Sequence, residues 1–538
     1  MKTLTFESTT TPHLDLHAKA IVSRLQAAGF TAYYAGGCVR DALRGAPVKD
    51  IDIATSATPD EVAALFPAQS IGVGKSFGVM LVVIEGLSFD VATFRTDGGY
   101  QDGRHPESIQ FDSAEHDAQR RDFTVNALFY DPLAEQLIDF VGGEEDLAKG
   151  VLRTVGDPLR RFQEDRLRML RAIRFATVCG WTIAPETWTA LCHEAPAISC
   201  VSMERIHTEF IRTLCEARVP SEAMNAFYAS GLLAHFFPEV ALLKGCLQDP
   251  VWHPEGDVWQ HTLRMLDAIP LPRDPLLVWS VVLHDIGKPK TLEVSTKPDG
   301  SPWYRTPGHA HVGAFMAEAI LTRFKASRAT LQAVSTAVKH HMHFIEFPKM
   351  RTSTQRRFLG RETIAMELEL HRLDCLSSHS NLNLYEAVKA ALATYANEAV
   401  LPPAVITGKL LLKLGYTAGP KLGHRLKDFY TRQLEGATAA ALLRAALLSA
   451  PGGTRKHPKR IAFVYGPEKP FLLRDVWEQL CQHPHWEVTL LVEAGVPWDE
   501  PYRPDRKILR QVGDCAGNVE PFDYAGYDYV CVGETPIL

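Results

Sequence analysis

The stretch that most constrains this chain is residues 34–55, which read YAGGCVRDALRGAPVKDIDIAT. An apolar run ends at Gly36 and Gly37, a short helical pattern follows with Arg40 in its first turn, and a strand-like run comes next. Glycines let backbone N–H groups approach a phosphate closely, and a helix N-terminus favours its negative charge. Arg40 can add charge-assisted hydrogen bonds to the same phosphates. The stretch therefore predicts a phosphate-binding turn.

The strand-like run carries two carboxylates, Asp50 and Asp52. Side chains two residues apart in a strand point to the same face, so both should project together while Ile51 and Ile53 turn into the core. Neighbouring carboxylates repel each other unless a cation lies between them. Their hard oxygens suit Mg²⁺, which also bridges substrate phosphates. We therefore predict a Mg²⁺ site beside the phosphate-binding turn.

Together and in this order, these features resemble the signature of the nucleotidyltransferase superfamily. The chain is similar to the class II tRNA nucleotidyltransferases (CCA-adding enzymes) and to the related bacterial poly(A) polymerases, over residues 33–436. The resemblance implies a third catalytic carboxylate, Asp90, on the strand next to the aspartate pair. We expect it to act as a base near the RNA 3′-hydroxyl, because phosphoryl transfer otherwise needs mainly positioning and charge neutralisation.

A second motif of the resemblance is RRDFTVNAL at residues 120–128, which matches the family pattern RRDFTxNAL at every fixed position. By itself the segment would be the start of an amphipathic helix. The resemblance implies that Arg121 binds the nucleotide phosphates. It also implies that Asp122 and Asn126 shape the pocket.

A glycine-rich, charged segment at residues 97–106, DGGYQDGRHP, predicts a flexible loop with Asp97 and Arg104 among its charged residues. CCA-adding enzymes have such a loop, and in that family it helps the site change from CTP to ATP. Its presence argues against an enzyme that adds only the two cytidines.

The pattern EDRLRMLRAIRF at residues 164–175 predicts one helix with Asp165, Arg168 and Arg171 on a shared face. Asp accepts hydrogen bonds and Arg donates them, so such a pair can read the Watson–Crick edge of a base. The alternative is a salt bridge on a solvated face. The family motif EDxxRxxRaxRF implies that Asp165 and Arg168 read the base, with Arg171 and Arg174 as phosphate or base contacts.

The second half of the chain resembles an HD-type metal phosphohydrolase domain, through an H…HD…D pattern that includes the segment VVLHDIGKP. A single histidine of this kind would more often be a core residue. The implied ligands are His261, His284, Asp285 and Asp374. Imidazole plus carboxylate suits Mn, Fe, Ni, Co or Zn, with Mg²⁺ as a further possibility, and such a metal can activate water for phosphoester cleavage. A second metal could be held by His311, His340 and His341.

Size and composition favour a multidomain enzyme of the cytoplasm. The chain has 538 residues and a formal net charge of −6, so any RNA contact must come from local basic surface. The ten cysteines include no C-x-x-C pair, which indicates a reducing compartment. No signal peptide and no run of the ~18 apolar residues needed for a membrane span is visible.

The predicted fold class is α+β, with a nucleotidyltransferase head of mixed sheet and helices, a helical neck, an HD domain, a helical tail and a small C-terminal α/β module. The corresponding ranges are 1–156, 157–245, 246–395, 396–450 and 451–538. The tail carries a basic stretch suited to RNA phosphates, namely Lys409, Lys413, Lys421, Arg425 and Lys427. In the last module we predict strands at 460–465, 486–492 and 527–532 around a helix at 472–482, with no assigned role.

These features predict a template-independent nucleotidyltransferase that adds CCA to the tRNA 3′ end from CTP and ATP. The HD domain would hydrolyse phosphate or cyclic phosphate esters, as at damaged RNA ends. The first alternative is a poly(A) polymerase that uses ATP alone. The second is an HD phosphohydrolase with a non-catalytic nucleotide-binding head, against which the intact Asp50, Asp52 and Arg168 argue.

Overall fold

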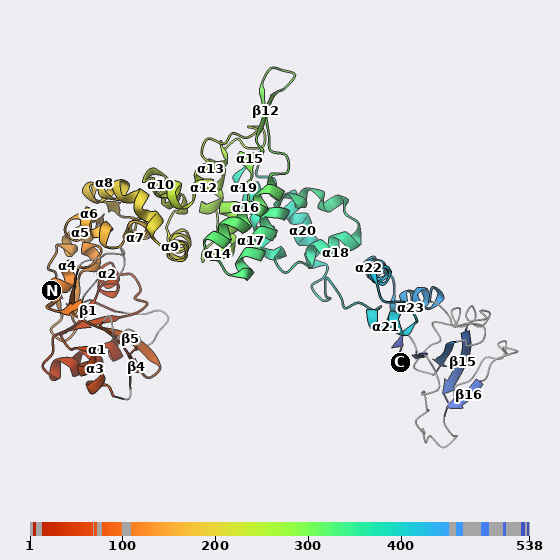
Figure 1. Cartoon of the computed structure of the whole chain (residues 1–538), viewed down its shortest axis with the longest axis horizontal. Coiled ribbons are helices and arrows are strands. Elements are labelled where there is room, and N and C mark those ends of the chain that lie inside the picture. The colour runs from red at the N-terminus through yellow and green to blue at the C-terminus, as the bar shows by residue number, and fades with distance from the viewer. Residues whose placement is uncertain are drawn as a thin grey trace. The chain divides into compact units, whose positions relative to one another are not determined.

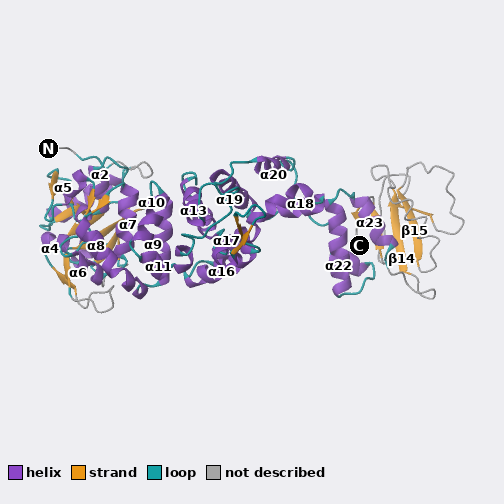
Figure 2. Cartoon of the chain, turned by 90° about the horizontal axis from the view of Figure 1, so that it is seen from above, coloured by secondary structure: helices purple, strands orange, loops and turns teal. Residues whose placement is uncertain are grey.

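The computed structural model describes residues 4–6, 13–67, 69–72, 78–98 and 109–450, and five strands beyond residue 458. The chain divides into two compact units, residues 1–344 with 365–383, and residues 345–364 with 384–538. In the first unit most strands belong to the N-terminal part and helices make up the rest (Figures 1 and 2). None of the helices in the described ranges combines the length and apolar character that crossing a bilayer requires.

The N-terminal part, the head, is built on a seven-stranded sheet in the order β3-β4-β5-β2-β1-β8-β9. The strands are β1 (Ala32–Ala35), β2 (Asp52–Thr55), β3 (Ser70–Ile71), β4 (Val79–Ile84), β5 (Leu87–Thr93), β8 (Phe129–Asp131) and β9 (Gln136–Ile138). Strands β2 and β5 run parallel with Ile53 opposite Val91, whereas β1 pairs with β2 antiparallel with Ala35 opposite Asp52. This register places Asp52 beside both the turn after β1 and the strand that carries Asp90.

Helices α1 (Leu14–Ala27), α2 (Gly37–Leu43) and α3 (Pro59–Leu65) complete the head core. Helix α1 has apolar residues at helical spacing, and its Ile21 and Val22 are fully buried. Helix α3 begins with a capping box, in which the Thr58 side chain accepts a hydrogen bond from the Glu61 N–H and the Glu61 carboxylate accepts one from the Thr58 N–H. These elements fix the sheet from which the carboxylates project.

The prediction of a single helix over 164–175 is wrong, because the helix is interrupted at Asp165. Helix α6 (Pro158–Glu164) ends there, Asp165 has extended backbone with φ −146° and ψ 105°, and α7 (Arg168–Cys179) starts three residues later. One carboxylate oxygen of Asp165 accepts a hydrogen bond from the Leu167 N–H at 3.1 Å. A short polar side chain that binds nearby backbone in this way competes with helix continuation.

The predicted helix start in 120–128 is also wrong. Helix α4 (Ala114–Gln119) ends before this segment, and only Thr124–Asn126 forms a short 3-10 turn. The Asp122 carboxylate accepts hydrogen bonds from the Phe123 N–H at 2.8 Å and from the Asn126 side-chain amide at 3.1 Å. These local bonds stabilise a turn that aims polar side chains toward α7.

The rest of the first unit is helical and shares one apolar core that runs from the neck into the HD domain. Its main helices are α8 (Pro185–Glu194), α9 (Met203–Glu216), α10 (Pro220–Ala229), α13 (Val258–Asp267), α14 (Pro275–Leu283), α16 (His309–Arg323), α17 (Arg328–His340) and α19 (Ile364–Ser377). Buried Phe210, Phe237 and Trp279 pack ring against ring, with centroids 5.7 to 6.0 Å apart.

A buried ion pair joins α7 to α9. The Arg174 Nε donates to the Glu209 carboxylate at 2.5 Å, and both side chains are less than a tenth exposed. We expect Glu209→Ala to lower the free energy of unfolding by about 3 kcal/mol, since it leaves a buried guanidinium with only the more distant Glu216 carboxylate, 3.9 Å from Nη1. Urea unfolding measures the loss. Glu204→Ala, an exposed carboxylate on the same helix, is the control and should cost less than about 1 kcal/mol; equal costs would contradict the assignment.

The second unit contains helices and a separate sheet, described here by itself. Its helices are α18 (Thr352–Leu359), α20 (Asn383–Ala393), α21 (Gly408–Lys413), α22 (Pro420–Leu434) and α23 (Ala439–Leu448). The sheet has the order β16-β15-β14-β17-β18. Strands β14 (Lys459–Tyr465), β15 (Trp486–Glu493), β16 (Leu509–Val512) and β17 (Tyr529–Val532) are parallel, and β18 (Thr535–Pro536) is antiparallel to β17. The three predicted strands are present, whereas the predicted helix at 472–482 lies outside the described residues.

Candidate functional sites

Three carboxylates gather at one point of the head sheet. Asp52 starts β2, Asp50 lies two residues before it, and the parallel register of β2 and β5 sets Asp90 next to Asp52. Strand β2 begins at Asp52, two residues later than predicted. Ile51 and Ile53 are buried, as predicted. Loss of solvation within the surrounding protein and repulsion from Asp50 and Asp90 raise the pKa of Asp52 to about 6. A cluster of oxygen donors that resists its own ionisation suits a hard divalent cation.

The glycine turn after β1 packs against Arg121. Gly36 has a φ of +74°, and a Cβ there would lie 2.8 Å from Arg121 Nη1, so any larger residue would displace that guanidinium. The other face of the turn leads into α2, from which Arg40 Nη1 donates to the Asn126 side-chain carbonyl at 2.7 Å. Arg121 Nη1 donates to the Asn126 backbone carbonyl at 3.1 Å. Asn126 thus links the Arg40 and Arg121 side chains through its side-chain and backbone carbonyls.

These residues line a pocket of about 560 Å³ that is rich in arginine. Its lining comprises Gly36, Gly37, Arg40, Asp52, Arg120, Arg121, Asp122, Asn126, Asp165, Leu167, Arg168, Arg171, Arg174, Phe175, Arg205 and Arg212. Arginines outnumber carboxylates here, so the pocket attracts polyanions. The cavity has the size of a small-molecule site, and Asp52 of the carboxylate cluster belongs to its lining.

Asp122 and Arg171 form the central ion pair of the pocket. Arg171 Nε and Nη2 donate to one Asp122 oxygen at 2.9 and 2.6 Å. Burial would raise the pKa of Asp122, but Arg171 and the Asn126 amide outweigh burial and lower the pKa to about 2. Asp122 is therefore a fixed anion that orients Arg171 and Asn126 at the pocket wall.

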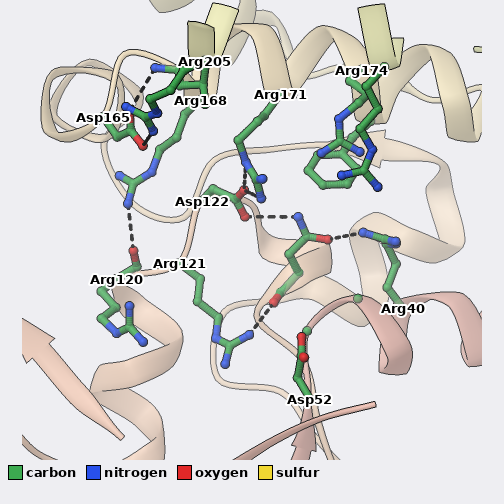
Figure 3. A pocket seen from close by; sticks show the side chains of 16 residues that line it. Arg40, Asp52, Arg120, Arg121, Asp122, Asp165, Arg168, Arg171, Arg174 and Arg205 are labelled. Atoms are coloured by element: carbon green, nitrogen blue, oxygen red, sulfur yellow. Dashed lines mark hydrogen bonds and ion pairs between the residues drawn. The ribbon is translucent and has the colours of Figure 1, made fainter. Parts of the chain in front are cut away.

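Asp165 and Arg168, the two residues predicted to read the base, each form an ion pair with a third residue and not with each other. Asp165 accepts a hydrogen bond from Arg205 Nη2 on α9 at 2.9 Å, and Arg168 Nη1 donates to Glu164 at 2.7 Å. A salt bridge between Asp165 and Arg168, the alternative, is therefore not what holds them. Both residues face the pocket from the joint between α6 and α7 (Figure 3).

Sequence reasoning missed Arg205 and Arg212, which reach the pocket from α9. They are seven residues apart, which is two helical turns, so they share one face of α9. The seven-residue spacing of the two arginines could have indicated a shared helix face from the sequence. What the sequence did not show is that α9 packs beside α7. Arg174 also lines the pocket, although its guanidinium binds Glu209; a contact with substrate remains a prediction for it.

The four predicted HD ligands come together from two helices, α13 and α19, and from the turn after α14. His261 Nε2 lies 3.1 Å from Asp374 Oδ1, and His284 Nε2 lies 3.1 Å from Asp285 Oδ2. The two histidine rings are 5.4 Å apart between centroids. Burial lowers the pKa of His261, but Asp374 and a further carboxylate, Glu255, outweigh it and raise the pKa to about 9. A divalent cation can replace a proton on a buried imidazole that lies between carboxylates.

A second cluster shares Asp285 with the first. Asp285 Oδ1 lies 3.5 Å from His309 Nε2 and 3.8 Å from His341 Nε2, and these two nitrogens are 3.2 Å apart. Of the three residues expected to extend the site, only His341 lies here. His311 is exposed and packs on Phe315. His309 takes its place, because residues two apart in a helix do not share a face.

His340, the remaining member of that expectation, lies outside the second cluster and contacts His343. Sequence reasoning also missed Lys288 of the HDIGK segment, whose Nζ donates to Asp285 at 2.7 Å and to Gln248 at 2.8 Å. Burial raises the pKa of Asp285, but His284 and Lys288 hold it well below its usual value. Asp285 is therefore ionised and central to both clusters.

Two further predicted regions are placed only in part. Asp97 ends β6 (Arg95–Asp97), which pairs with β7 (Ile109–Phe111), but Arg104 and residues 99–108 lie outside the described residues. The basic residues of the tail are all exposed on α21 and α22, namely Lys409, Lys413, Lys421, Arg425 and Lys427. Their exposure leaves them accessible to a polyanion.

Comparison with known families agrees with this geometry. Residues 32–153 match the poly A polymerase head domain, residues 180–243 match the probable RNA and SrmB-binding site of polymerase A, and residues 257–377 match the HD domain. The fold and the matches thus define a head of the poly A polymerase type and an HD domain in the same chain. The head and neck, residues 32–153 and 180–243, match the models of the poly A polymerase family, and residues 257–377 match the HD domain.

Relatives of known name are CCA-adding enzymes. Those from Geobacillus thermodenitrificans and Lactiplantibacillus plantarum are 45% and 38% identical over 40% and 44% of this chain, and over 53% and 58% of their own length. The chain thus spans about half the length of the curated relatives it matches. The structure of the Bacillus stearothermophilus CCA-adding enzyme in complex with CTP is similar, with a TM-score of 0.61 and 27% identity over 79% of this chain and 94% of that one.

Proposed function

We propose that the protein adds CCA to the 3′ end of tRNA from CTP and ATP. The observation that carries the proposal is the carboxylate cluster at the edge of an arginine-lined pocket, which joins metal chemistry to triphosphate binding. The names of the relatives favour CCA addition over the poly(A) alternative. The free cysteines of the described residues suit the reducing cytoplasm that we expected.

In this proposal Asp50 and Asp52 hold Mg²⁺, which when bound neutralises phosphate charge at the reacting phosphorus. Asp90 accepts the proton of the RNA 3′-hydroxyl, for which its place beside Asp52 is suitable. Arg121 and Arg171 bind the triphosphate. The glycine turn supplies close backbone N–H groups for the same purpose.

Base selection falls to Asp165 and Arg168, with Arg205 holding Asp165. We expect Asp165→Ala to blur discrimination between CTP and ATP by about tenfold, because the lost acceptor serves one base edge, while the triphosphate keeps its arginines. Competition kinetics with both nucleotides measures this ratio. Arg160→Met, on the exposed face of α6, is the control. A uniform loss for all four nucleotides would show that Asp165 acts only in folding.

The HD clusters support a metal-dependent phosphohydrolase as a second activity. We propose that His261, His284, Asp285 and Asp374 hold one divalent metal, and that His309 and His341 hold a second one that shares Asp285. Imidazole-rich donors favour Mn, Fe, Ni, Co or Zn. When bound, such a metal supplies an activated water for the cleavage of phosphate or 2′,3′-cyclic phosphate esters. Lys288 places a positive charge beside the shared carboxylate.

A test of the proposed transfer uses tRNA that ends at the discriminator base, with each nucleotide alone and then both. CTP alone should extend the tRNA by two residues, and ATP alone should give no product until the cytidines are present. Long products from ATP alone would favour the poly(A) alternative. The absence of any extension would favour a non-catalytic head.

A further inference from the structure

The loop before α13 holds a buried carboxylate that the proposed metal sites do not use as a ligand. Glu255 has a side chain with no exposure, and its Oε1 accepts hydrogen bonds from His261 Nδ1 at 2.7 Å and from His253 Nδ1 at 2.9 Å. Its Oε2 is buried and has no hydrogen-bond partner among the described residues. An ionisable group is costly to bury, so its place against His261 calls for a role.

The loop is fixed directly after Glu255, by contacts of Gly256 and Asp257. Asp257 caps α13 by accepting from the Gln260 N–H at 2.8 Å, and its other oxygen accepts from the Gly245 N–H at 2.7 Å. The Gly256 carbonyl between them accepts from the Gln248 side chain at 3.3 Å. The backbone next to Glu255 is thus anchored, and the two histidine contacts hold its carboxylate.

The four histidines of the two clusters differ in their Nδ1 partner. His284, His309 and His341 each donate Nδ1–H to a backbone carbonyl, of Val281, Thr306 and Val338, at 2.7 to 2.8 Å. His261 instead meets the Glu255 carboxylate. A carboxylate that accepts from Nδ1–H fixes the tautomer and orients the ring. It also makes Nε2 a stronger metal ligand than a neutral carbonyl at Nδ1 would.

We propose that Glu255 is a positioning residue that holds His261 Nδ1–H so that Nε2 faces the site shared with His284 and Asp374. This inference rests on the proposed metal site of the HD domain. His253 takes the second lone pair of the same oxygen and keeps Glu255 in place. The site beside His261 should therefore bind its metal more tightly than the site at His309 and His341.

The test is a titration of metal-free protein with Co²⁺ against a competing chelator, in an excess of Mg²⁺ that fills the carboxylate site of the head. The variants are Glu255→Gln, which keeps size and one acceptor but loses the charge, and Glu255→Ala. We expect Co²⁺ affinity to fall about tenfold in Glu255→Gln and up to about a hundredfold in Glu255→Ala. Glu293→Gln, an exposed carboxylate on β12 (Glu293–Thr296), is the control and should bind as the wild type does.

Melting temperature of the metal-free proteins and nucleotide addition by the head report folding in the same samples. Glu255→Gln that binds Co²⁺ within about twofold of the wild type would overturn the inference. Wild-type protein that binds no Co²⁺ at all would instead overturn the proposed HD metal site on which it rests. A loss in Glu255→Gln with unchanged melting temperature supports a role of the charge in holding the ligand.

Discussion

Alanine in place of Asp52 is expected to lower nucleotide addition by about a thousandfold or more. Asp52 lies where β2 meets the glycine turn and the strand of Asp90. In the proposed function its loss removes a metal ligand at the reacting phosphate. An effect of this size corresponds to about 4 kcal/mol of transition-state stabilisation, which is reasonable for a metal that neutralises transferring charge. Single-turnover extension of tRNA by CTP measures the rate without interference from product release.

Glu144→Ala on α5 (Gly143–Lys149) is a matched control, since it removes an exposed carboxylate from the same domain. The control should extend tRNA at the wild-type rate. Asp50→Ala should resemble Asp52→Ala. Incorporation close to wild type in both aspartate variants would contradict the assignment of the head as the transferase site.

The double variant His284→Ala with Asp285→Ala is expected to abolish metal-dependent phosphoester cleavage while nucleotide addition stays within about twofold of wild type. Asp285 belongs to both HD clusters, so the variant removes ligands from each of them. Transfer depends on a different set of carboxylates, those at β2 and β5. The measurements are bound metal per protein, cleavage of a 2′,3′-cyclic phosphate, and tRNA extension, all on one preparation.

The opposing view is that these buried residues only hold the helices together. Under that view the double variant would melt earlier, lose both activities at once, and contain as little metal as the wild type. His311→Ala removes an exposed histidine of α16 that lies outside both clusters, and it should change none of the three measurements. A loss of metal without a loss of transfer separates the two views.

The sequence predicted the parts of the site that depend on short-range pattern. Alternation around Asp52 placed its carboxylate opposite buried Ile51 and Ile53, and the H…HD…D pattern predicted ligands that the fold brings together. The helix break at Asp165 escaped prediction because helical periodicity continues through it. There a local side-chain bond to the Leu167 N–H outweighs the periodic signal.

The residues that sequence reasoning missed depend on tertiary contacts. Arg205 reaches Asp165 across 40 residues of chain, and Glu255 reaches His261 from a loop whose position depends on Gly245 and Gln248. Neither contact has a periodic signature. The choice of His309 over His311 also required knowledge of which face of α16 packs on Asp285.

The most direct test of CCA addition is to sequence the 3′ ends that wild-type protein makes. The substrate is tRNA that ends at the discriminator base, incubated with all four nucleoside triphosphates and Mg²⁺. If the protein adds CCA, the products end in CCA and are extended no further. Products with tails of adenosine alone, or with mixed nucleotides of no fixed length, would contradict CCA addition.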